Sequence, residues 1–203
     1  MSRQKERFEA MRAEATERIL ISAAKLFANK TFAKTTMQDI ADDAGLSKGL
    51  AYRYFATKEE IMSNLIEISI PGIERITALF KQEGNEKEVV MKVTTFLLDN
   101  LKVDPSSTDG LFLFSQIDSF SEKELSSELK NAVRTSMKKL IDNISDVILA
   151  GQKQGYFKSG DPRRYAMFYY SIFQGVAFTS RSFHEEYVYP TAEMFLDFLI
   201  KQT

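Results

Sequence analysis

The chain of 203 residues contains no cysteine and a single histidine, His184. The absence of cysteine excludes disulfides and thiolate chemistry, and it fits a reducing compartment. The N-terminal residues lack the apolar region of a signal peptide, and no run reaches the roughly 18 apolar residues that span a membrane. From these absences we expect a cytoplasmic protein.

Patterns that would indicate catalysis are also missing. His184 is followed by Glu185 and Glu186, which could suggest a metal or acid–base site, but no second histidine supplies the i, i+4 spacing of a zinc helix. An exposed helix end is the simpler interpretation. There is no glycine-rich phosphate loop and no Ser–His–Asp order. We therefore predict no catalytic residues, no metal ligands and no cofactor.

Proline and glycine are scarce, with four and nine occurrences, and helical patterns fill most of the chain between them. No run shows the alternation of a half-buried strand, so we predict an all-α fold. The predicted helices cover about residues 13–29, 36–44, 48–54, 57–71, 86–102, 109–119, 121–154, 161–185 and 190–201. Pro71-Gly72 should end or kink the fourth helix, and a capping box of Ser121 and Glu124 should start the seventh.

Two short helices meet in the stretch TTMQDIADDAGLSKGLAYRYFATKEE, residues 35–60. Thr36 predicts an N-cap whose capping box is completed by Asp39, and Gly45 should end that helix because glycine adopts the left-handed conformation without strain. Ser47 can cap the next helix two residues later. Two such helices joined by a short turn form a helix-turn-helix, whose second helix, about residues 47–54, can lie in the DNA major groove.

The second helix carries residues that can read DNA. Lys48 can donate to guanine O6 and N7, Gly49 allows close approach, and Leu50 can contact a thymine methyl. Groups that could meet phosphates follow at Tyr52, Tyr54 and Lys58. The alternative is an ordinary helical hairpin with a solvated face. Residues 1–35 hold eight basic against four acidic side chains, which suits a surface facing phosphates but also a solvated helix.

An ordered set of residues resembles the DNA-binding domain of the TetR family of transcriptional regulators. It consists of Ala24-Lys25-Leu26-Phe27, Thr35-Thr36, Ile40-Ala41, Ala44-Gly45-Leu46-Ser47, Gly49, Tyr52, Tyr54-Phe55 and Lys58. The resemblance implies DNA contacts by Thr36, Gln38, Ser47, Lys48, Gly49, Leu50, Tyr52, Tyr54 and Lys58. Two positions depart from the family pattern. Thr31 stands where glycine is usual, which predicts a differently shaped turn, and Ala51 replaces a larger apolar residue.

Near the C-terminus, residues 165–178 and 194–200 are apolar almost all round, whereas a helix that faces one core needs one apolar stripe. This excess predicts that both helices pack against their copies in a four-helix dimer interface. The predicted interface residues are Phe168, Ile172, Gly175, Phe195 and Leu199. The family resemblance also implies a homodimer formed by the last two long helices. The alternative is a wholly buried core helix beside an ordinary amphipathic one.

The resemblance further implies a small-molecule effector inside the C-terminal domain, coupled to the DNA-binding domain through the fourth helix. The chain offers a mostly aromatic lining with few polar groups, which suits a hydrophobic or amphipathic ligand. Its predicted members are Phe80, Phe96, Phe112, Phe114, Gln116, Tyr169, Phe173 and Gln174. Aromatic residues at helical spacing more often form an ordinary core without a cavity, which is the alternative.

We predict an N-terminal, three-helix DNA-binding domain in residues 1–60 and a helical effector-binding and dimerisation domain in residues 61–203. The predicted function is sequence-specific transcriptional regulation, as a repressor released from a palindromic operator by a small hydrophobic ligand. An activator would share the same DNA-binding architecture. A helical protein-interaction module or an enzyme without DNA binding would not explain the match from Ala24 to Lys58.

Overall fold

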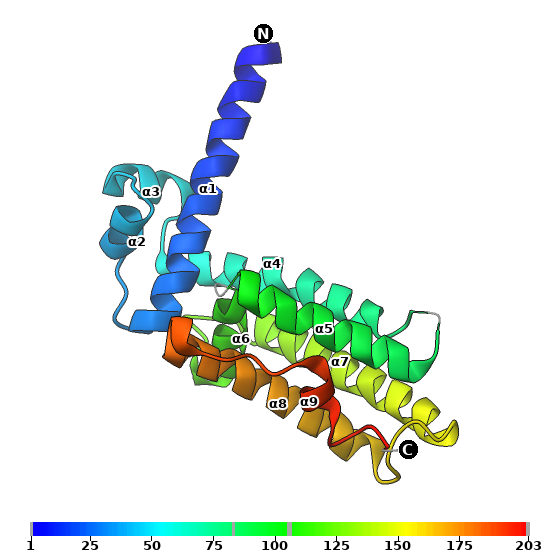
Figure 1. Cartoon of the computed structure of the whole chain (residues 1–203). Coiled ribbons are helices and arrows are strands. Elements are labelled where there is room, and N and C mark those ends of the chain that lie inside the picture. Colours follow the sequence, from blue (N-terminus) through cyan, green and yellow to red (C-terminus); the bar gives the residue numbers. More distant parts are fainter. Residues whose placement is uncertain (1, 83, 105–106, 202–203) are drawn as a thin grey trace. The chain divides into compact units, whose positions relative to one another are not determined.

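Several helices of this protein begin at residues whose side chains accept hydrogen bonds from the N–H groups of the first turn. In the computed structural model, which describes residues 2–82, 84–104 and 107–201, such caps are Thr36, Ser47, Asn85 and Thr191. Each cap of this kind stabilises its helix by about 1 kcal/mol. The helices in Figure 1 are α1 (Ser2–Lys30), α2 (Met37–Asp43), α3 (Lys48–Tyr54), α4 (Lys58–Leu79), α5 (Glu86–Val103), α6 (Ser107–Ser115), η1 (Ile117–Ser119), α7 (Ser127–Lys153), α8 (Pro162–Phe183), η2 (His184–Glu186) and α9 (Ala192–Leu196).

The predicted all-α fold is confirmed. Within the described residues no β-strand forms, and Phe157 and Ile200 make an isolated antiparallel bridge. None of the helices in this part of the chain combines the length and the apolar character that a membrane crossing requires.

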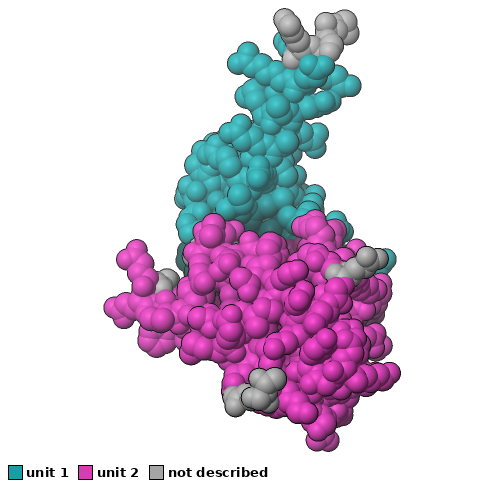
Figure 2. Space-filling view, turned by 45° about the vertical axis from the view of Figure 1, so that its right-hand side comes forward, with its two compact units in different colours: residues 1–68, 112–130 teal, residues 69–111, 131–203 magenta. Residues whose placement is uncertain are grey.

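The chain divides into two compact units, which Figure 2 shows in separate colours. Unit 1 contains residues 1–68 and 112–130, and unit 2 contains residues 69–111 and 131–203. Unit 1 therefore holds the whole predicted helix-turn-helix, the first half of α4, and a segment from much later in the sequence. The boundary between the units falls inside α4, and two further boundaries fall inside α6 and α7.

The core of unit 1 follows the helical spacing of the sequence. Ile19, Ala23 and Phe27 of α1 are at most 1% exposed, and Ile40 of α2 and Ala51 of α3 are fully buried. Burying a large apolar side chain contributes about 1.5–3 kcal/mol. The small Ala51 lets α3 lie close to its neighbours.

In unit 2, α5, α7 and α8 lie side by side (Figure 1). The hydroxyl of Tyr169 on α8 lies 2.9 Å from Thr94 Oγ1 on α5, and Gln154, the residue after α7, donates to Glu86 Oε1 at 3.0 Å. Tyr169 is 2% exposed. Burial raises the pKa of Tyr169 well above its ordinary value, so the phenol stays protonated as a hydrogen-bonding core residue.

Of the two outcomes predicted at Pro71-Gly72, an end or a kink of the helix, the end does not occur, because α4 continues to Leu79. Proline has no N–H for the carbonyl four residues earlier, which costs about 3 kcal/mol in a helix interior. Ile73 and Thr77 are both buried in unit 2, and the Thr77 hydroxyl donates to the carbonyl of Ile73 at 2.7 Å. We attribute the continuation of α4 to this packing, which outweighs the lost hydrogen bond.

Ser121 and Glu124 make only half of the predicted capping box, and this half lies in a turn before α7. Ser121 N donates to Glu124 Oε2 at 2.7 Å. Ser126 Oγ, five residues later, accepts from Leu129 N at 3.3 Å, and α7 begins at Ser127. The predicted start of this helix at Ser121 is therefore too early.

The last helix is much shorter than the predicted 190–201, because α9 has five residues. After it the chain pairs with the loop before α8. Lys158 N donates to Leu199 O at 2.9 Å, and Lys201 N donates to Tyr156 O at 3.0 Å. These bonds use the backbone groups that a longer helix would need, so the helix ends.

Candidate nucleic-acid interface

Thr36 and Asp39 fix the start of α2 by reciprocal hydrogen bonds. Asp39 N donates to Thr36 Oγ1 at 3.1 Å, and Thr36 N donates to Asp39 Oδ2 at 2.9 Å. The ammonium of Lys30 lies 2.7 Å from Asp39 Oδ1. This hydrogen bond, followed by those from Thr36, holds the pKa of Asp39 well below its ordinary value of 3.8. The predicted capping box is thus confirmed, and Lys30 ties the end of α1 to it.

The turn between α2 and α3 is also built as predicted. Gly45 has a φ of +64°, which glycine adopts without strain, and Ser47 Oγ accepts from Leu50 N at 3.2 Å. Arg18 of α1 adds a contact that the sequence did not indicate. Its guanidinium donates to the carbonyls of Ala44 and Gly45, so a cation lies at the C-terminal end of α2, where carbonyl groups face outward.

α3 presents one buried and one exposed face. Ala51 faces the core, whereas Lys48 and Gly49 are exposed and Tyr52 is 46% exposed. A Cβ added at Gly49 would meet nothing within 4 Å, so another molecule can approach the backbone there. The ammonium of Lys48 lies 6.0 Å from the centre of the Tyr52 ring. A cation, a phenol and open backbone therefore share this face, and all are groups that DNA-reading helices use. Of the remaining predicted contacts, Leu50 and Tyr54 on α3 are half-buried and Ser47 is exposed.

Two predicted DNA contacts on the α2 side are partly engaged within the protein. The Thr36 hydroxyl donates to Asp39 Oδ2 at 2.7 Å, which uses its only hydrogen. Gln38 Nε2 donates to Asp42 Oδ1 at 2.7 Å, which leaves the side-chain oxygen of Gln38 and one of its N–H groups. Both side chains are exposed. Gln38 therefore keeps a donor for a phosphate or a base, whereas Thr36 would have to break its hydrogen bond to Asp39 Oδ2 to donate.

Lys58 has a different environment from the phosphate contact that the sequence predicts. Its ammonium donates to the carbonyls of Phe32 at 2.8 Å and of Thr35 at 3.1 Å, and it lies 4.4 Å from the centre of the Phe32 ring. An ammonium group has three donors, so at most one remains for a phosphate. Lys58 thus holds the turn between α1 and α2 to the start of α4.

Phe32 lies at the centre of an aromatic cluster that the sequence did not predict. Its ring centroid is 5.0 Å from that of Phe27 and 5.5 Å from that of Phe120, with the last pair edge to face at 89°. The ammonium of Lys130 donates to the carbonyl of Phe120 at 2.5 Å. Residues so distant in sequence carry no local pattern that pairs them, so only covariation among relatives could have indicated this contact.

The residues predicted to line a ligand pocket are divided between the two units. Phe112, Phe114 and Gln116 belong to unit 1, and the other five belong to unit 2. Within unit 2, Phe80 and Tyr169 pack edge to face with ring centroids 5.9 Å apart. Phe173 is 9% exposed and Gln174 is half-buried, with its amide donating to the Tyr170 hydroxyl at 2.8 Å. Phe96 is 51% exposed, so it does not line an enclosed site within unit 2.

The residues predicted for a dimer interface also separate into two groups. Phe195 and Leu199 are 3% and 0% exposed, so one protomer already covers them. They are core residues and are not available to a partner. Phe168 is 52% exposed, Ile172 is half-buried and Gly175 is exposed, and these three remain on the surface of α8.

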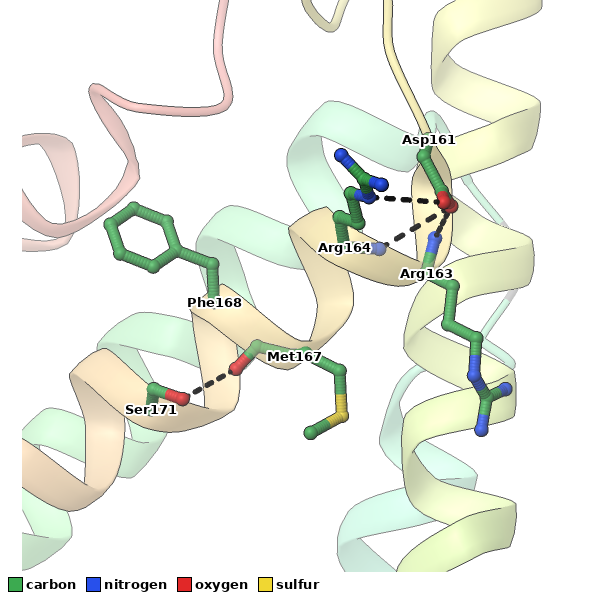
Figure 3. A pocket seen from close by; sticks show the side chains of 6 residues that line it. All are labelled: Asp161, Arg163, Arg164, Met167, Phe168 and Ser171. Atoms are coloured by element: carbon green, nitrogen blue, oxygen red, sulfur yellow. Dashed lines mark hydrogen bonds and ion pairs between the residues drawn. The ribbon is translucent and has the colours of Figure 1, made fainter.

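A surface hollow of about 450 Å³ lies beside Phe168 at the start of α8 (Figure 3). Met167 and Phe168 form its apolar part, and Met167 is 48% exposed. The polar part consists of Asp161, Arg163, Arg164 and Ser171. Arg164 lies 3.6 Å from Asp161, and Arg163 pairs with Asp142 of α7, so the charges at this rim are largely balanced within the protein.

The side chain of His184 lies outside the described residues, so its predicted place at an exposed helix end stays a prediction. Among the residues that the structure describes, no three His, Asp or Glu side chains gather closely enough to hold a metal ion.

Residues 19–65 match the family model described as bacterial regulatory proteins, tetR family. The uncharacterized HTH-type transcriptional regulator YerO of Bacillus subtilis (strain 168) is 44% identical over 57 residues, which are 28% of this chain and 20% of YerO. The uncharacterized HTH-type transcriptional regulator Mb2274c of Mycobacterium bovis is 27% identical over 156 residues, 76% of each chain. The HTH-type transcriptional repressor KstR2 of Mycobacterium tuberculosis is 44% identical over 48 residues, 24% of each chain.

Solved structures share the fold over most of the chain. The ketosteroid transcriptional regulator KstR2 has a TM-score of 0.70 at 20% identity, over 92% of this chain and 95% of KstR2. AibR in complex with isovaleryl coenzyme A and operator DNA has a TM-score of 0.68 at 17% identity, over 90% of this chain and 94% of AibR. The matched relatives are transcriptional regulators, which are not enzymes. The N-terminal helix-turn-helix and the helical remainder therefore occur together in regulators of this fold.

Proposed function

We propose that this chain, which belongs to the TetR family of transcriptional regulators, is a homodimeric repressor that a small hydrophobic or amphipathic ligand releases from a palindromic operator. The observation that carries the proposal is the surface of α3. Its buried Ala51 orients the helix, and Lys48, Gly49 and Tyr52 are exposed.

In the proposed complex, α3 lies in the major groove. Lys48 donates to guanine O6 and N7, Leu50 contacts a thymine methyl, and Gly49 lets the backbone approach the bases. Ser47 and Gln38 are exposed beside them and donate to phosphates. The hydroxyls of Tyr52 and Tyr54 serve the same purpose, whereas Lys58 and Thr36 act mainly by fixing the turns around α3.

The homodimer is proposed to form through α8. Phe168, Ser171, Gly175 and Thr179 are exposed and follow helical spacing, so they make one stripe. A Cβ added at Gly175 would meet nothing within 4 Å, which allows a partner helix to come close. Two copies of α3 about 34–36 Å apart would then meet successive major grooves of a two-fold symmetric site.

Two relatives support the regulatory mode. KstR2 is described as a repressor, and AibR, which shares this fold, was crystallised with both isovaleryl coenzyme A and operator DNA. A ligand that weakens DNA binding must itself bind more weakly to the DNA-bound dimer, by the same factor. For couplings of about 1–3 kcal/mol that factor is about 5–150.

The test is selection of DNA from random or genomic fragments by the full-length protein. We expect enrichment of an inverted repeat whose half-sites lie about 10 base pairs apart, or a multiple of that distance. A reporter that carries the selected site between promoter and gene should be silenced by the protein. Failure to enrich any duplex would contradict the DNA-binding proposal. Activation of the reporter would contradict only the proposal that the protein is a repressor.

A further inference from the structure

The end of unit 2 where α4 leads into α5 contains a cavity of about 250 Å³. Its apolar wall comes from Phe80, Val89, Val147 and Ala150. Phe80 and Val89 are 2% and 7% exposed, and Phe80 is held in place by the ring of Tyr169. At about 30 Å³ for each heavy atom, the space suits a molecule of about eight such atoms.

Glu86, the first residue of α5, has one carboxylate oxygen without a partner at this cavity. Oε1 accepts from Gln154 at 3.0 Å. Oε2 is sealed from solvent, and no donor among the described residues reaches it. A buried carboxylate oxygen is unfavourable without a hydrogen bond. The terminal torsion of glutamate is soft, so a small rotation can turn Oε2 toward a ligand.

The charged groups of the lining favour a cation. Glu86 and Asp146 supply two carboxylates, and Lys81 supplies one ammonium group. Asp146 and Lys81 are both exposed at the rim, whereas the unpaired oxygen belongs to Glu86. A ligand that brings an N–H donor with a positive charge would satisfy that oxygen and balance the excess negative charge.

We propose that this cavity binds a small protonated primary amine with a short unbranched apolar chain. The ammonium donates to Glu86 Oε2, the carboxylate of Asp146 adds attraction from the rim, and the chain packs on Phe80 and Val147. A metal ion fits less well, because no three metal-ligating side chains gather among the described residues. The role of this amine as effector rests on the proposed function, whereas its binding does not.

The binding test uses isothermal titration calorimetry on the full-length protein, with n-pentylammonium, 1-pentanol and pentanoate as probes of equal chain length. We expect n-pentylammonium to bind at least tenfold more tightly than 1-pentanol, and pentanoate not to bind. Glu86→Gln should weaken n-pentylammonium at least tenfold. Glu88→Gln is the matched control, since Glu88 is exposed on the same helix and does not line the cavity.

Val147→Phe is a second variant. It places a larger side chain in the wall of the cavity, leaves Glu86 unchanged and should abolish binding. It therefore tests the proposal if Glu86→Gln does not fold. Any of three results would overturn the proposal: equal affinity for the amine and the alcohol, unchanged affinity for n-pentylammonium in either folded variant, or no binding by wild type. Operator binding is measured separately by fluorescence anisotropy. An amine that binds in the cavity but leaves DNA affinity unchanged would overturn only its role as effector.

Discussion

At the scale of single residues, Thr31 has a strained backbone conformation. Its φ is +70°, a left-handed conformation that β-branched residues rarely adopt. The carbonyl of Thr31 accepts from the Thr35 hydroxyl at 2.8 Å, and Lys58 binds the carbonyls of Phe32 and Thr35. These contacts keep the turn in the conformation that glycine would take. The threonine therefore strains the turn, because glycine adopts this conformation without a steric cost.

Thr31→Gly should raise the free energy of unfolding by about 1 kcal/mol. Removing the β carbon relieves about 1–2 kcal/mol of strain, and the greater freedom of glycine in the unfolded chain offsets part of this gain. Urea denaturation measures the difference. Thr31→Ala keeps the β carbon and should gain much less. A glycine variant no more stable than wild type would show that the turn is unstrained.

Asp39 should make stability depend on pH. Lys30 and then Thr36 hold its folded-state pKa below the ordinary 3.8. Its contribution to stability is therefore present above the unfolded pKa and is lost as the pH falls through the folded pKa. Acidification below about pH 4 should lower the Tm of wild type more than that of Asp39→Asn, as followed by circular dichroism. Lys30→Met should reduce the same dependence. Parallel Tm curves for wild type and Asp39→Asn would contradict this role.

At the scale of elements, the helix-turn-helix depends on a segment that follows it by many residues. Residues 112–130 belong to unit 1, where the ring of Phe120 packs on Phe32. Phe32 also supplies a carbonyl to Lys58. The turn that positions α2 and α3 is therefore held from α4 on one side and from Phe120 on the other. A change at either element can reach α3 without any direct contact with DNA.

Phe120→Leu tests this dependence, because leucine stays apolar but loses the edge-to-face contact, worth about 0.5–1.5 kcal/mol. We expect faster hydrogen exchange at the amides of residues 31–36, with no change in α5. Phe183→Leu is a control, since Phe183 is 56% exposed. Exchange rates in the turn that match wild type would show that Phe120 does not hold it.

The sequence alone was sufficient to predict features that depend on residues within about four positions of one another. The caps at Thr36 and Ser47 and the left-handed Gly45 are of this kind. Distant partners decided the rest. α9 ends early because the chain after it pairs with residues 156–158, and Lys58 turns inward because two carbonyls more than 20 residues away accept from it. Periodicity reports a buried face but does not say which residue covers it.

At the scale of the whole molecule, assembly concerns the surface of α8. The apolar character of residues 165–178 predicted an interface, and part of it is explained by the core residues Tyr169 and Phe173. Phe168 remains exposed beside the hollow of Figure 3. The interface that we propose is thus smaller than the sequence suggested and excludes Phe195 and Leu199.

Phe168→Glu should dissociate the dimer, because a partner would bury an unpaired carboxylate there. Phe96→Glu is a closely matched control, since Phe96 is 51% and Phe168 is 52% exposed and only Phe168 lies on α8. Sedimentation velocity at micromolar concentration measures both. A monomeric wild type, or two variants with the same sedimentation behaviour, would contradict the interface. Phe195→Glu is unsuitable, because that side chain is buried within one protomer.

The central claim, that α3 reads DNA bases, is tested most directly by the base preference of Lys48→Ala on the selected operator. Removing a contact to guanine should cost about 1–3 kcal/mol and relax the preference at one base pair in each half-site. Lys87→Ala, which removes an equal charge from an exposed position on α5, should leave that preference unchanged. Fluorescence anisotropy against a set of singly substituted operators measures both quantities at fixed salt concentration. A Lys48→Ala protein with wild-type affinity and wild-type preference at every base pair would contradict the account.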